Sequence, residues 1–290
     1  MSGSVTIGDL NIGDGFPAYI IAEIGINHNG SIDLAKRLVD IAVAAGCNAV
    51  KFQKRTVDVI YTPEQMSKPF ESPFGTTMGD LRRGREFDYD KFVEIDRHCK
   101  ESGIVWFASC WDEGSVDFIE QFNPPCYKIA SASLTDDNLL RHTRATGKPL
   151  ILSTGMSTLE QIDHAIEVLG TQDLVILHCC STYPSYYENL NLRVITTLKA
   201  RYGLPVGYSG HETGLPSTVA AVALGACVIE RHITTDRALW GTDQAASLEP
   251  SGINRLVRDI RLVETSMGDG VKRLAPGEDA AILRLRRVGQ

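Results

Sequence analysis

The stretch "YIIAEIGINHNG" at residues 19–30 decides how the chain is interpreted, because it sets a carboxylate, Glu23, inside an apolar run. Continuous apolar runs that end in Asn and Gly are typical of strands buried in a parallel sheet. A carboxylate is almost never fully buried there unless it is paired. The stretch therefore predicts a core strand, and Glu23 belongs either to an ion pair or to a reaction.

Short runs rich in Val and Ile recur along the chain, separated by amphipathic segments long enough for a crossover helix. The expected strands are residues 19–26, 49–53, 105–110, 126–130, 150–154, 174–179, 205–209 and 227–232. The expected helices are residues 31–45, 89–102, 112–122, 136–146, 158–169, 190–202, 214–225 and 251–267. Eight such units predict one α/β domain over residues 1–290, a (β/α)8 TIM barrel, with a doubly wound sheet as the alternative.

Boundary residues support these helices. Ser31 with Asp33 in the first turn, and Ser157–Thr158 before an apolar-periodic run, are typical helix starts. Glycines that favour a left-handed C-cap follow six of the helices, at Gly46, Gly103, Gly147, Gly170, Gly203 and Gly225.

Two segments lie outside the repeat. Residues 1–15 contain "VTIGDLNIGDG", whose Gly-Asp pairs predict a β-hairpin that closes the floor of the barrel. Residues 54–88 are a long insertion rich in Pro, Gly and Thr after the second strand. Because loops after the carboxyl ends of barrel strands overhang the active site, we expect a lid or substrate-contacting loop there, with an inert insertion as the alternative.

Composition excludes several classes of protein. A net charge of −7 without a long basic stripe argues against general nucleic-acid binding. The apolar runs are too short for a membrane span and the N-terminus has no signal-peptide pattern, so we expect a cytoplasmic protein. The seven Cys lack CxxC spacing, which indicates reduced thiols. The basic clusters "LRRGR" at 81–85 and "LRLRR" at 283–287 are interpreted as solvated faces.

Polar side chains gather at the expected strand ends, which meet at one mouth of a barrel. Because such positions are normally apolar, converging charges there cost free energy unless they pair, bind metal or meet a charged ligand. The candidates are Glu23, Asn27, Lys51, Gln53, Ser109, Lys128, Ser131, Ser153, Thr154, His178, Ser181, Tyr183, Ser209, His211, Glu230, His232 and Asp243.

Lys51 in "AVKFQ" and Lys128 in "CYKIAS" are the cations of this set. Two ammonium groups among several Ser hydroxyls suit a phosphate or carboxylate, so the sequence predicts an anionic substrate. Structural ion pairs with Glu23 or Glu230 are one alternative. A Schiff-base lysine is another, because a desolvated strand Lys can act as a nucleophile.

His211 in "GYSGHE" and His232 in "IERHIT" end consecutive expected strands. Imidazoles on adjacent strands can share a divalent ion, although lone histidines are often satisfied core residues. Glu230 points to the same side of its strand as His232 and is placed to orient a ligand or bind a hydroxyl.

A series of motifs carries a family resemblance: "IAEIGINHNG", "AVKFQ", "YKIAS", "LILSTGMST", "LHCCSTYP", "GYSGHE" and "IERHIT" followed by "GTDQAASLEP". In this order, over roughly residues 15–275, they resemble the sialic acid synthase family. Those enzymes condense phosphoenolpyruvate with a sugar aldehyde, such as N-acetylmannosamine or a related amino or deoxy sugar, to a 3-deoxy nonulosonic acid and phosphate.

The resemblance implies a role for each candidate. Phosphoenolpyruvate would be held by Lys51, Gln53, Ser109, Lys128, Ser131, Ser153, Ser181 and Ser209. A manganese or magnesium ion would be held by His211 and His232, and the acceptor by Glu230, Asp243 and Tyr183. Glu23 would be the acid/base carboxylate that stabilises a cationic centre at C2 while water adds and phosphate leaves by C–O cleavage.

The chain also departs from the family pattern. Family members continue into a C-terminal antifreeze-like domain that is exchanged in a homodimer, and this sequence ends at "LRLRRVGQ", where the linker would begin. We expect no such domain here, which leaves the acceptor and the homodimer open. Two other hypotheses remain, a Schiff-base pyruvate aldolase that uses Lys128 and a non-catalytic sugar-phosphate-binding barrel.

Overall fold

The computed structural model describes residues 3–288, and its centre is a closed barrel of eight parallel strands. The strands are β3 (Tyr19–Gly25), β4 (Ala49–Lys54), β7 (Val105–Cys110), β8 (Tyr127–Ile129), β9 (Leu150–Ser153), β10 (Leu174–Cys179), β11 (Val206–Gly210) and β12 (Val228–His232). Each strand pairs with the next along the chain, and β12 pairs with β3. This closure confirms the predicted barrel and excludes the doubly wound sheet.

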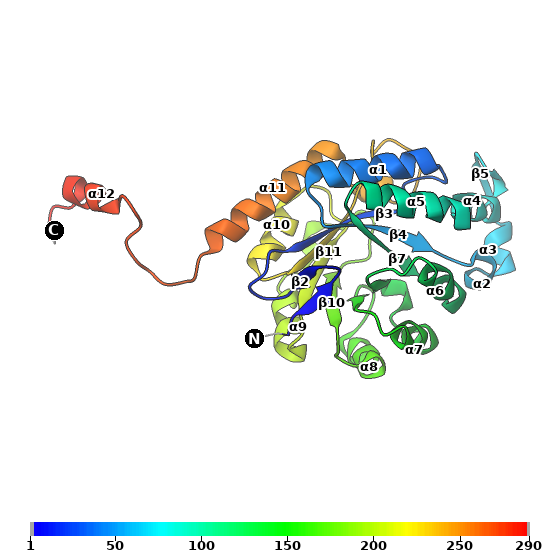
Figure 1. Cartoon of the computed structure of the whole chain (residues 1–290), viewed down its shortest axis with the longest axis horizontal. Coiled ribbons are helices and arrows are strands. Elements are labelled where there is room, and N and C mark those ends of the chain that lie inside the picture. Colours follow the sequence, from blue (N-terminus) through cyan, green and yellow to red (C-terminus); the bar gives the residue numbers. More distant parts are fainter. Residues whose placement is uncertain (1–2, 289–290) are drawn as a thin grey trace.

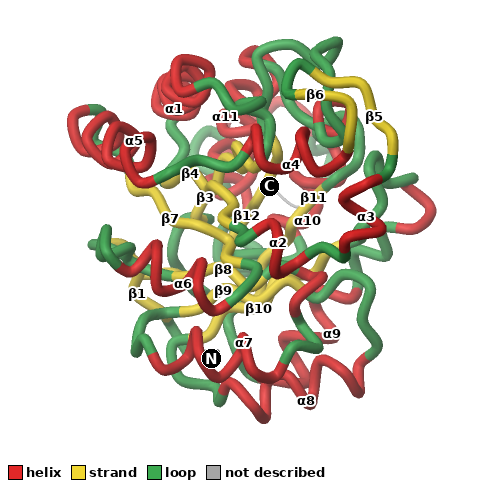
Figure 2. Tube along the Cα trace, turned by 90° about the vertical axis from the view of Figure 1, so that its right-hand side faces the viewer, coloured by secondary structure: helices red, strands yellow, loops and turns green. Residues whose placement is uncertain are grey.

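Helices surround the ring of strands, as Figure 2 shows. They are α1 (Ile32–Ala45), α5 (Tyr89–Glu101), α6 (Glu113–Glu120), α7 (Asp137–Ala145), α8 (Leu159–Leu169), α9 (Val194–Tyr202), α10 (Pro216–Ala223) and α11 (Pro250–Met267). The largest difference from the sequence prediction is the start of α9, because a short 3-10 turn at Tyr187–Asn189 precedes it. Ser31 caps α1 as predicted by accepting a hydrogen bond from the Leu34 N–H, and Gly46 ends it at φ +79°.

Alternation along the strands creates two apolar layers. Outward side chains such as Ile20 and Val50 pack against the helices, whereas inward ones such as Ile21, Phe107 and Leu177 fill the barrel. Because the side-chain period of a strand is two, the same alternation continues to the strand ends and fixes which polar groups face inward there.

The floor of the barrel is closed by an antiparallel hairpin of β1 (Val5–Ile7) and β2 (Leu10–Ile12). Its Val5, Ile7 and Ile12 are buried in the same cluster as the inward side chains of the barrel. The hairpin therefore excludes water from the end of the barrel opposite the polar strand ends.

The insertion at 54–88 has its own secondary structure: α2 (Val57–Ile60), α3 (Pro63–Ser67), β5 (Pro69–Ser72), β6 (Gly75–Thr77) and α4 (Met78–Arg85). Capping boxes begin two of its helices, with Thr62 and Gln65 at α3 and Thr77 and Asp80 at α4. Figure 2 shows these elements in front of the ring of strands. A Pro- and Gly-rich composition suggested a loop, but these short-range caps stabilise helices within it.

At the other end of the chain, α12 (Glu278–Leu285) lies apart from the barrel beyond α11 (Figure 1). Its side chains are exposed or half-exposed, as expected for the "LRLRR" cluster. Among residues 3–288, no helix has the length and apolarity needed to cross a membrane.

Candidate active site

In every barrel strand, the inward-facing residue nearest the carboxyl end has a polar or sulfur-containing side chain. These side chains line a cavity of about 190 Å³ at the carboxyl ends of the strands. From the strands come Glu23, Lys51, Gln53, Ser109, Lys128, Ser153, Cys179, Ser209, Glu230 and His232. The loops beyond them add Ser131, Ser181, Tyr183 and His211.

This cavity gathers the site residues that the sequence predicted, with Asp243 as the exception. Asp243 lies instead on an adjoining, larger cavity, where its Oδ2 is 3.7 Å from His232 Nδ1. The two cavities share Gln53, Trp111 and Tyr183 in their linings, so they lie next to each other.

Three other strand-end candidates serve the scaffold. His178 faces away from the cavity, and its Nε2 is 2.7 Å from the carbonyl oxygen of Leu190. Thr154 donates to the carbonyl of Leu177, and Asn27 donates to Ser247 Oγ and a backbone carbonyl. None of the three lines the cavity, and the family resemblance gave none of them a role.

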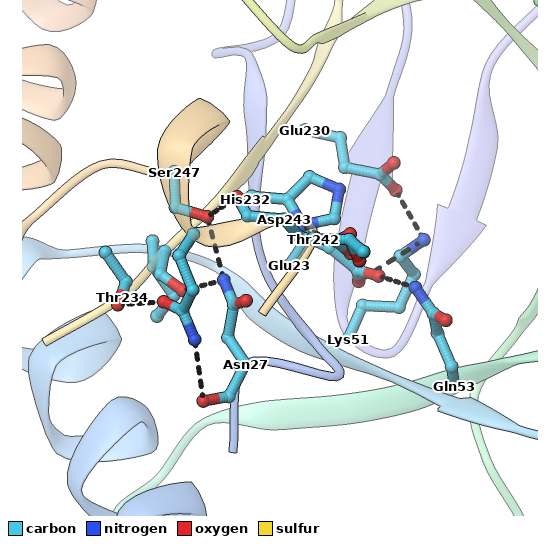
Figure 3. A network of polar contacts seen from close by, with 12 residues as sticks. Glu23, Asn27, Lys51, Gln53, Glu230, His232, Thr234, Thr242, Asp243 and Ser247 are labelled. Carbon is cyan, nitrogen blue, oxygen red and sulfur yellow. Dashed lines mark hydrogen bonds and ion pairs between the residues drawn. The ribbon is translucent and has the colours of Figure 1, made fainter. Parts of the chain in front are cut away.

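Two lysines and two glutamates form the centre of the site, which we call the mouth cluster: Glu23, Lys51, Lys128 and Glu230. Figure 3 shows Lys51 between the carboxylates of Glu23 and Glu230. Lys51 Nζ lies 3.3 Å from Glu23 Oε2 and 3.2 Å from Glu230 Oε2. Lys128 Nζ lies 3.1 Å from Glu230 Oε1. All four side chains are buried, so the Coulomb interactions among them are strong.

Burial and neighbouring charges shift the pKa values of the two carboxyl groups in opposite directions. Burial raises the pKa of Glu23 to about 7, because Lys51 compensates only part of the desolvation cost. Burial would also raise the pKa of Glu230, but Lys128 and Lys51 outweigh it and hold that pKa well below its ordinary value. Glu23 therefore exchanges a proton near neutral pH while Glu230 stays ionised.

The mouth cluster leaves several polar atoms without a hydrogen-bond partner. Glu23 Oε1 accepts from Gln53 Nε2 at 2.8 Å, and Glu230 Oε1 accepts from Ser209 Oγ at 2.9 Å. The other oxygen of each carboxylate is only ion-paired with Lys51, and the buried hydroxyls of Ser109 and Ser153 have no hydrogen-bond partner. Since buried polar groups are nearly always satisfied, these atoms indicate a ligand site.

Ser131 and Ser181 complete the rim of the cavity beside Gly155. The Gly155 N–H donates to Ser131 Oγ at 3.0 Å. A Cβ at Gly155 would lie 2.1 Å from Ser181 Oγ, so only glycine permits this close approach of backbone and hydroxyl.

The two imidazoles lie side by side, with ring centroids 5.3 Å apart. His211 Nδ1 is 2.8 Å from the carbonyl oxygen of Cys180, which fixes the proton there and leaves Nε2 as the lone-pair nitrogen. Burial lowers the pKa of His232 to about 3, so this ring is neutral, and its buried Nδ1 has no hydrogen-bond partner. Burial alone would lower the pKa of His211, but Cys179 outweighs it and raises that pKa above its ordinary value. Two adjacent imidazoles suit a divalent metal when both are neutral, and no group of three or more His, Cys, Asp or Glu ligands occurs among residues 3–288.

The adjoining cavity has a volume of about 650 Å³ and is lined largely by the insertion and the loop at 240–243. Arg82 and Arg85 of α4 face it, whereas Arg83 is exposed and pairs with Asp58. The interpretation of "LRRGR" as a solvated face was therefore wrong for two of its three arginines. The spacing of three residues between Arg82 and Arg85 was the available signal, because it places both on one side of a helix.

Sequence reasoning also missed Trp111, Met156 and Cys179 in the lining of the inner cavity. Trp111 and Met156 follow strand ends as apolar residues, so a search for polar groups passed over them. Cys179 has the inward period-two position of β10, which could have identified it.

A second buried ion pair lies outside the barrel wall, between β12 and the loop after β11. Arg231 donates to Glu212 O at 2.6 Å, to Gly214 O at 2.9 Å and to Thr218 Oγ1 at 2.7 Å. The Glu212 carboxylate accepts from Tyr208 OH at 2.9 Å and from Thr218 at 2.8 Å. This outer cluster, defined as Tyr208, Glu212, Thr218 and Arg231, is almost fully hydrogen-bonded and joins the residues next to the two histidines.

Comparison with known proteins identifies a family. The model of the NeuB family matches residues 38–272. The chain is 39% identical to the N-acetylneuraminate-9-phosphate synthase of Homo sapiens, over 93% of this chain and 76% of that protein. It is 36% identical to the N,N'-diacetyllegionaminic acid synthase of Campylobacter jejuni subsp. jejuni, over 92% of this chain and 83% of that one.

A solved structure agrees with these relatives. The N-acetylneuraminic acid synthetase of Leptospira borgpetersenii, crystallised in complex with citrate, superposes with a TM-score of 0.87 at 31% identity and covers 99% of both chains. Structures of 3-deoxy-D-arabino-heptulosonate 7-phosphate synthase from Thermotoga maritima share the fold, at 15% identity and a TM-score of 0.71.

Proposed function

The chain belongs to the NeuB family, and on that premise we propose that it condenses phosphoenolpyruvate with a sugar aldehyde, giving a 3-deoxy nonulosonic acid and phosphate. It is a transferase, as its relatives among the sialic, legionaminic and pseudaminic acid synthases are. The observation that carries the proposal is the mouth cluster: two buried ammonium groups beside unsatisfied Ser hydroxyls, in a cavity of about 190 Å³.

The donor fits this cavity by charge and by hydrogen bonding. Phosphoenolpyruvate carries a phosphate and a carboxylate, and Lys51 and Lys128 supply cations for both. The free hydroxyls of Ser109 and Ser153 supply further donors. Together these groups would hold the donor with its C3 toward the acceptor, which converts an encounter of two molecules into an oriented reaction.

Glu23 is the group that we assign to proton transfer. When C3 of phosphoenolpyruvate bonds to the aldehyde carbon, positive charge develops at C2, water adds there, and phosphate leaves with the C2–O bond pair. A carboxylate with a pKa of about 7 can oppose that charge and accept a proton from the incoming water. Lys51 lies 3.3 Å from one Glu23 oxygen and Gln53 donates to the other, yet burial still holds the pKa near 7, which favours a group that exchanges protons over a permanently ionised partner of Lys51.

We further propose a divalent metal, manganese or magnesium, held by His211 and His232 with water and substrate as the remaining ligands. When bound, such an ion polarises an aldehyde oxygen as a Lewis acid. Asp243 and Tyr183 border the same space and are proposed to meet the acceptor. The homodimer and the cytoplasmic location stay predictions from the sequence.

The test is consumption of phosphoenolpyruvate by the purified chain with manganese, across a panel of N-acetylated and deoxy hexosamines and their 6-phosphates. A product nine carbons long, detected by mass, is the expected result. Consumption without such a product, or no consumption with any sugar, would contradict the proposal. Trapping with borohydride and pyruvate addresses the aldolase alternative: it should not label Lys128, because that ammonium is ion-paired with Glu230.

A further inference from the structure

The outer cavity continues the inner one away from the strand ends. Its volume of about 650 Å³ is in the range of small-molecule sites, and it shares Gln53, Trp111 and Tyr183 with the inner cavity. The outer cavity is therefore the neighbouring space of suitable size for the far end of an acceptor whose aldehyde carbon meets the donor at the mouth cluster.

Three guanidinium groups line that cavity, and each lies over an aromatic ring. The distances from the guanidinium carbon to the ring centroid are 4.3 Å for Arg55 over Trp111, 3.5 Å for Arg82 over Tyr61 and 4.7 Å for Arg85 over Trp240. Stacking fixes the plane of a guanidinium and leaves its N–H edges available for an anion.

These arginines differ in how far the protein already satisfies them. Arg55 pairs with Glu86 at 3.4 Å and also donates to Gln53. The hydrogen-bonding atom nearest to Arg82 is Met66 Sδ, a weak acceptor, at 3.8 Å. Within residues 3–288, no hydrogen bond or ion pair involves Arg85, although its Nε is buried. Arg82 and Arg85 therefore present charged donors without strong acceptors.

Carboxylates on the same lining do not neutralise this end of the cavity. Glu86 is engaged by Arg55 and by Lys54 at 3.7 Å. Asp243 also lines the outer cavity and attracts Arg85, but it makes no ion pair with Arg85 and lies 3.7 Å from His232 Nδ1. Glu71 on β5 is exposed to solvent. Burial lowers the pKa of Arg85, which means that its charge is poorly solvated where it stands.

We propose that Arg82 and Arg85 bind a phosphate monoester at the end of the acceptor remote from its aldehyde, so that the acceptor is a phosphorylated hexosamine. A phosphate dianion has three oxygens and can take one guanidinium edge from each side. A neutral hydroxymethyl group would leave these two half-buried guanidinium groups, and the buried Nε of Arg85, without a charged acceptor. This inference rests on the proposed condensation and deepens it by naming the acceptor class.

The experiment compares kcat/KM for N-acetylmannosamine and for its 6-phosphate, followed by consumption of phosphoenolpyruvate, in the full chain with manganese. The wild-type protein should prefer the phosphorylated sugar by about a hundredfold or more. Arg82→Gln and Arg85→Gln should each reduce that preference about tenfold or more, by lowering the value for the phosphorylated sugar alone. Arg83→Gln is the matched control on the same helix and should leave both values unchanged.

Two results would overturn the inference: equal use of both sugars by the wild-type protein, or an equal loss with both sugars in the Arg82 and Arg85 variants. Failure of the condensation itself has a different signature, which is no activity with either sugar. In that case the affinity for N-acetylmannosamine 6-phosphate, measured by calorimetry, tests the inference independently of the condensation. Binding that Arg85→Gln weakens supports it, and binding that is absent or insensitive to Arg85→Gln contradicts it.

Discussion

The mouth cluster and the outer cluster are two buried sets of charges at the ends of the same strands, and they are built differently. In the outer cluster, Arg231 and Glu212 use nearly all of their polar atoms in hydrogen bonds, and only Arg231 Nε lacks a partner. In the mouth cluster, Glu23 and Glu230 each keep one oxygen without a hydrogen bond.

The difference separates a structural ion pair from a binding site. A satisfied pair recovers its desolvation cost inside the protein and is expensive to break. An unsatisfied cluster recovers part of that cost only when a ligand arrives, so it serves function at the expense of stability. The predictions below break one cluster or the other.

The largest effect is expected from Arg231→Ala, which leaves the buried Glu212 charge uncompensated. We expect a loss of about 3–5 kcal/mol in the free energy of unfolding, measured by urea denaturation. The double variant Arg231→Met with Glu212→Leu should recover most of that loss. A loss below about 1 kcal/mol for Arg231→Ala would show that the outer cluster does not stabilise the fold.

Breaking the mouth cluster should affect catalysis more than folding. Lys128→Met removes a cation from the donor site, and we expect kcat/KM to fall about 10²–10³-fold. The loss of stability should be smaller than for Arg231→Ala, because Glu230 keeps Lys51 and Ser209. Lys100→Met, at an exposed lysine paired with Asp96, is the control and should retain activity. The same kcat/KM for Lys128→Met and Lys100→Met would show that Lys128 does not contribute to the donor site.

A paired comparison of hydroxyl groups sharpens the contrast. Thr218→Val removes hydrogen bonds to both charges of the outer cluster and should cost about 1.5–3 kcal/mol of stability. Ser109→Ala removes a hydroxyl without a partner and should change stability by less than about 0.5 kcal/mol while it weakens binding of phosphoenolpyruvate. Equal destabilisation by the two substitutions, in the same denaturation assay, would contradict the distinction.

The smallest effect concerns pH. The folded protein holds a proton on Glu23 up to a pKa of about 7, whereas the unfolded chain releases it near 4.5. The folded state therefore binds more protons between these values, and stability falls as pH rises through this window. Glu23→Gln should remove this dependence, so that the free energy of unfolding of the variant relative to the wild type rises from pH 4 to pH 8. If the free energy of unfolding changes with pH in the same way for both proteins across that range, burial does not raise the pKa of Glu23.

The fold was predictable from the sequence because the strand and helix periods recur in eight units, despite the insertion at 54–88, and glycines such as Gly46 mark the helix ends. The mouth cluster was predictable for a related reason. Lys51, Lys128 and Glu230 are charged residues in apolar strands, which is rare enough to be informative.

His178 precedes the inward Cys179 on β10, so strand alternation could have placed its side chain outside the cavity. What could not be predicted depends on contacts between distant segments. Arg231 alternates with Glu230 and His232, which placed it outside the barrel, but its partner Glu212 could not be inferred from the chain alone. The role of Arg82 and Arg85 depended on how the insertion folds, and its composition concealed the caps at Thr62 and Thr77.

Calorimetric titration of phosphoenolpyruvate into the wild-type protein, Lys51→Met and Lys100→Met tests most directly whether the mouth cluster is a site for that donor. Removal of one charge-assisted contact should weaken binding at least about tenfold in Lys51→Met. The Lys100→Met protein should bind as the wild type does. The same dissociation constant for all three proteins would contradict the assignment of Lys51 to the donor.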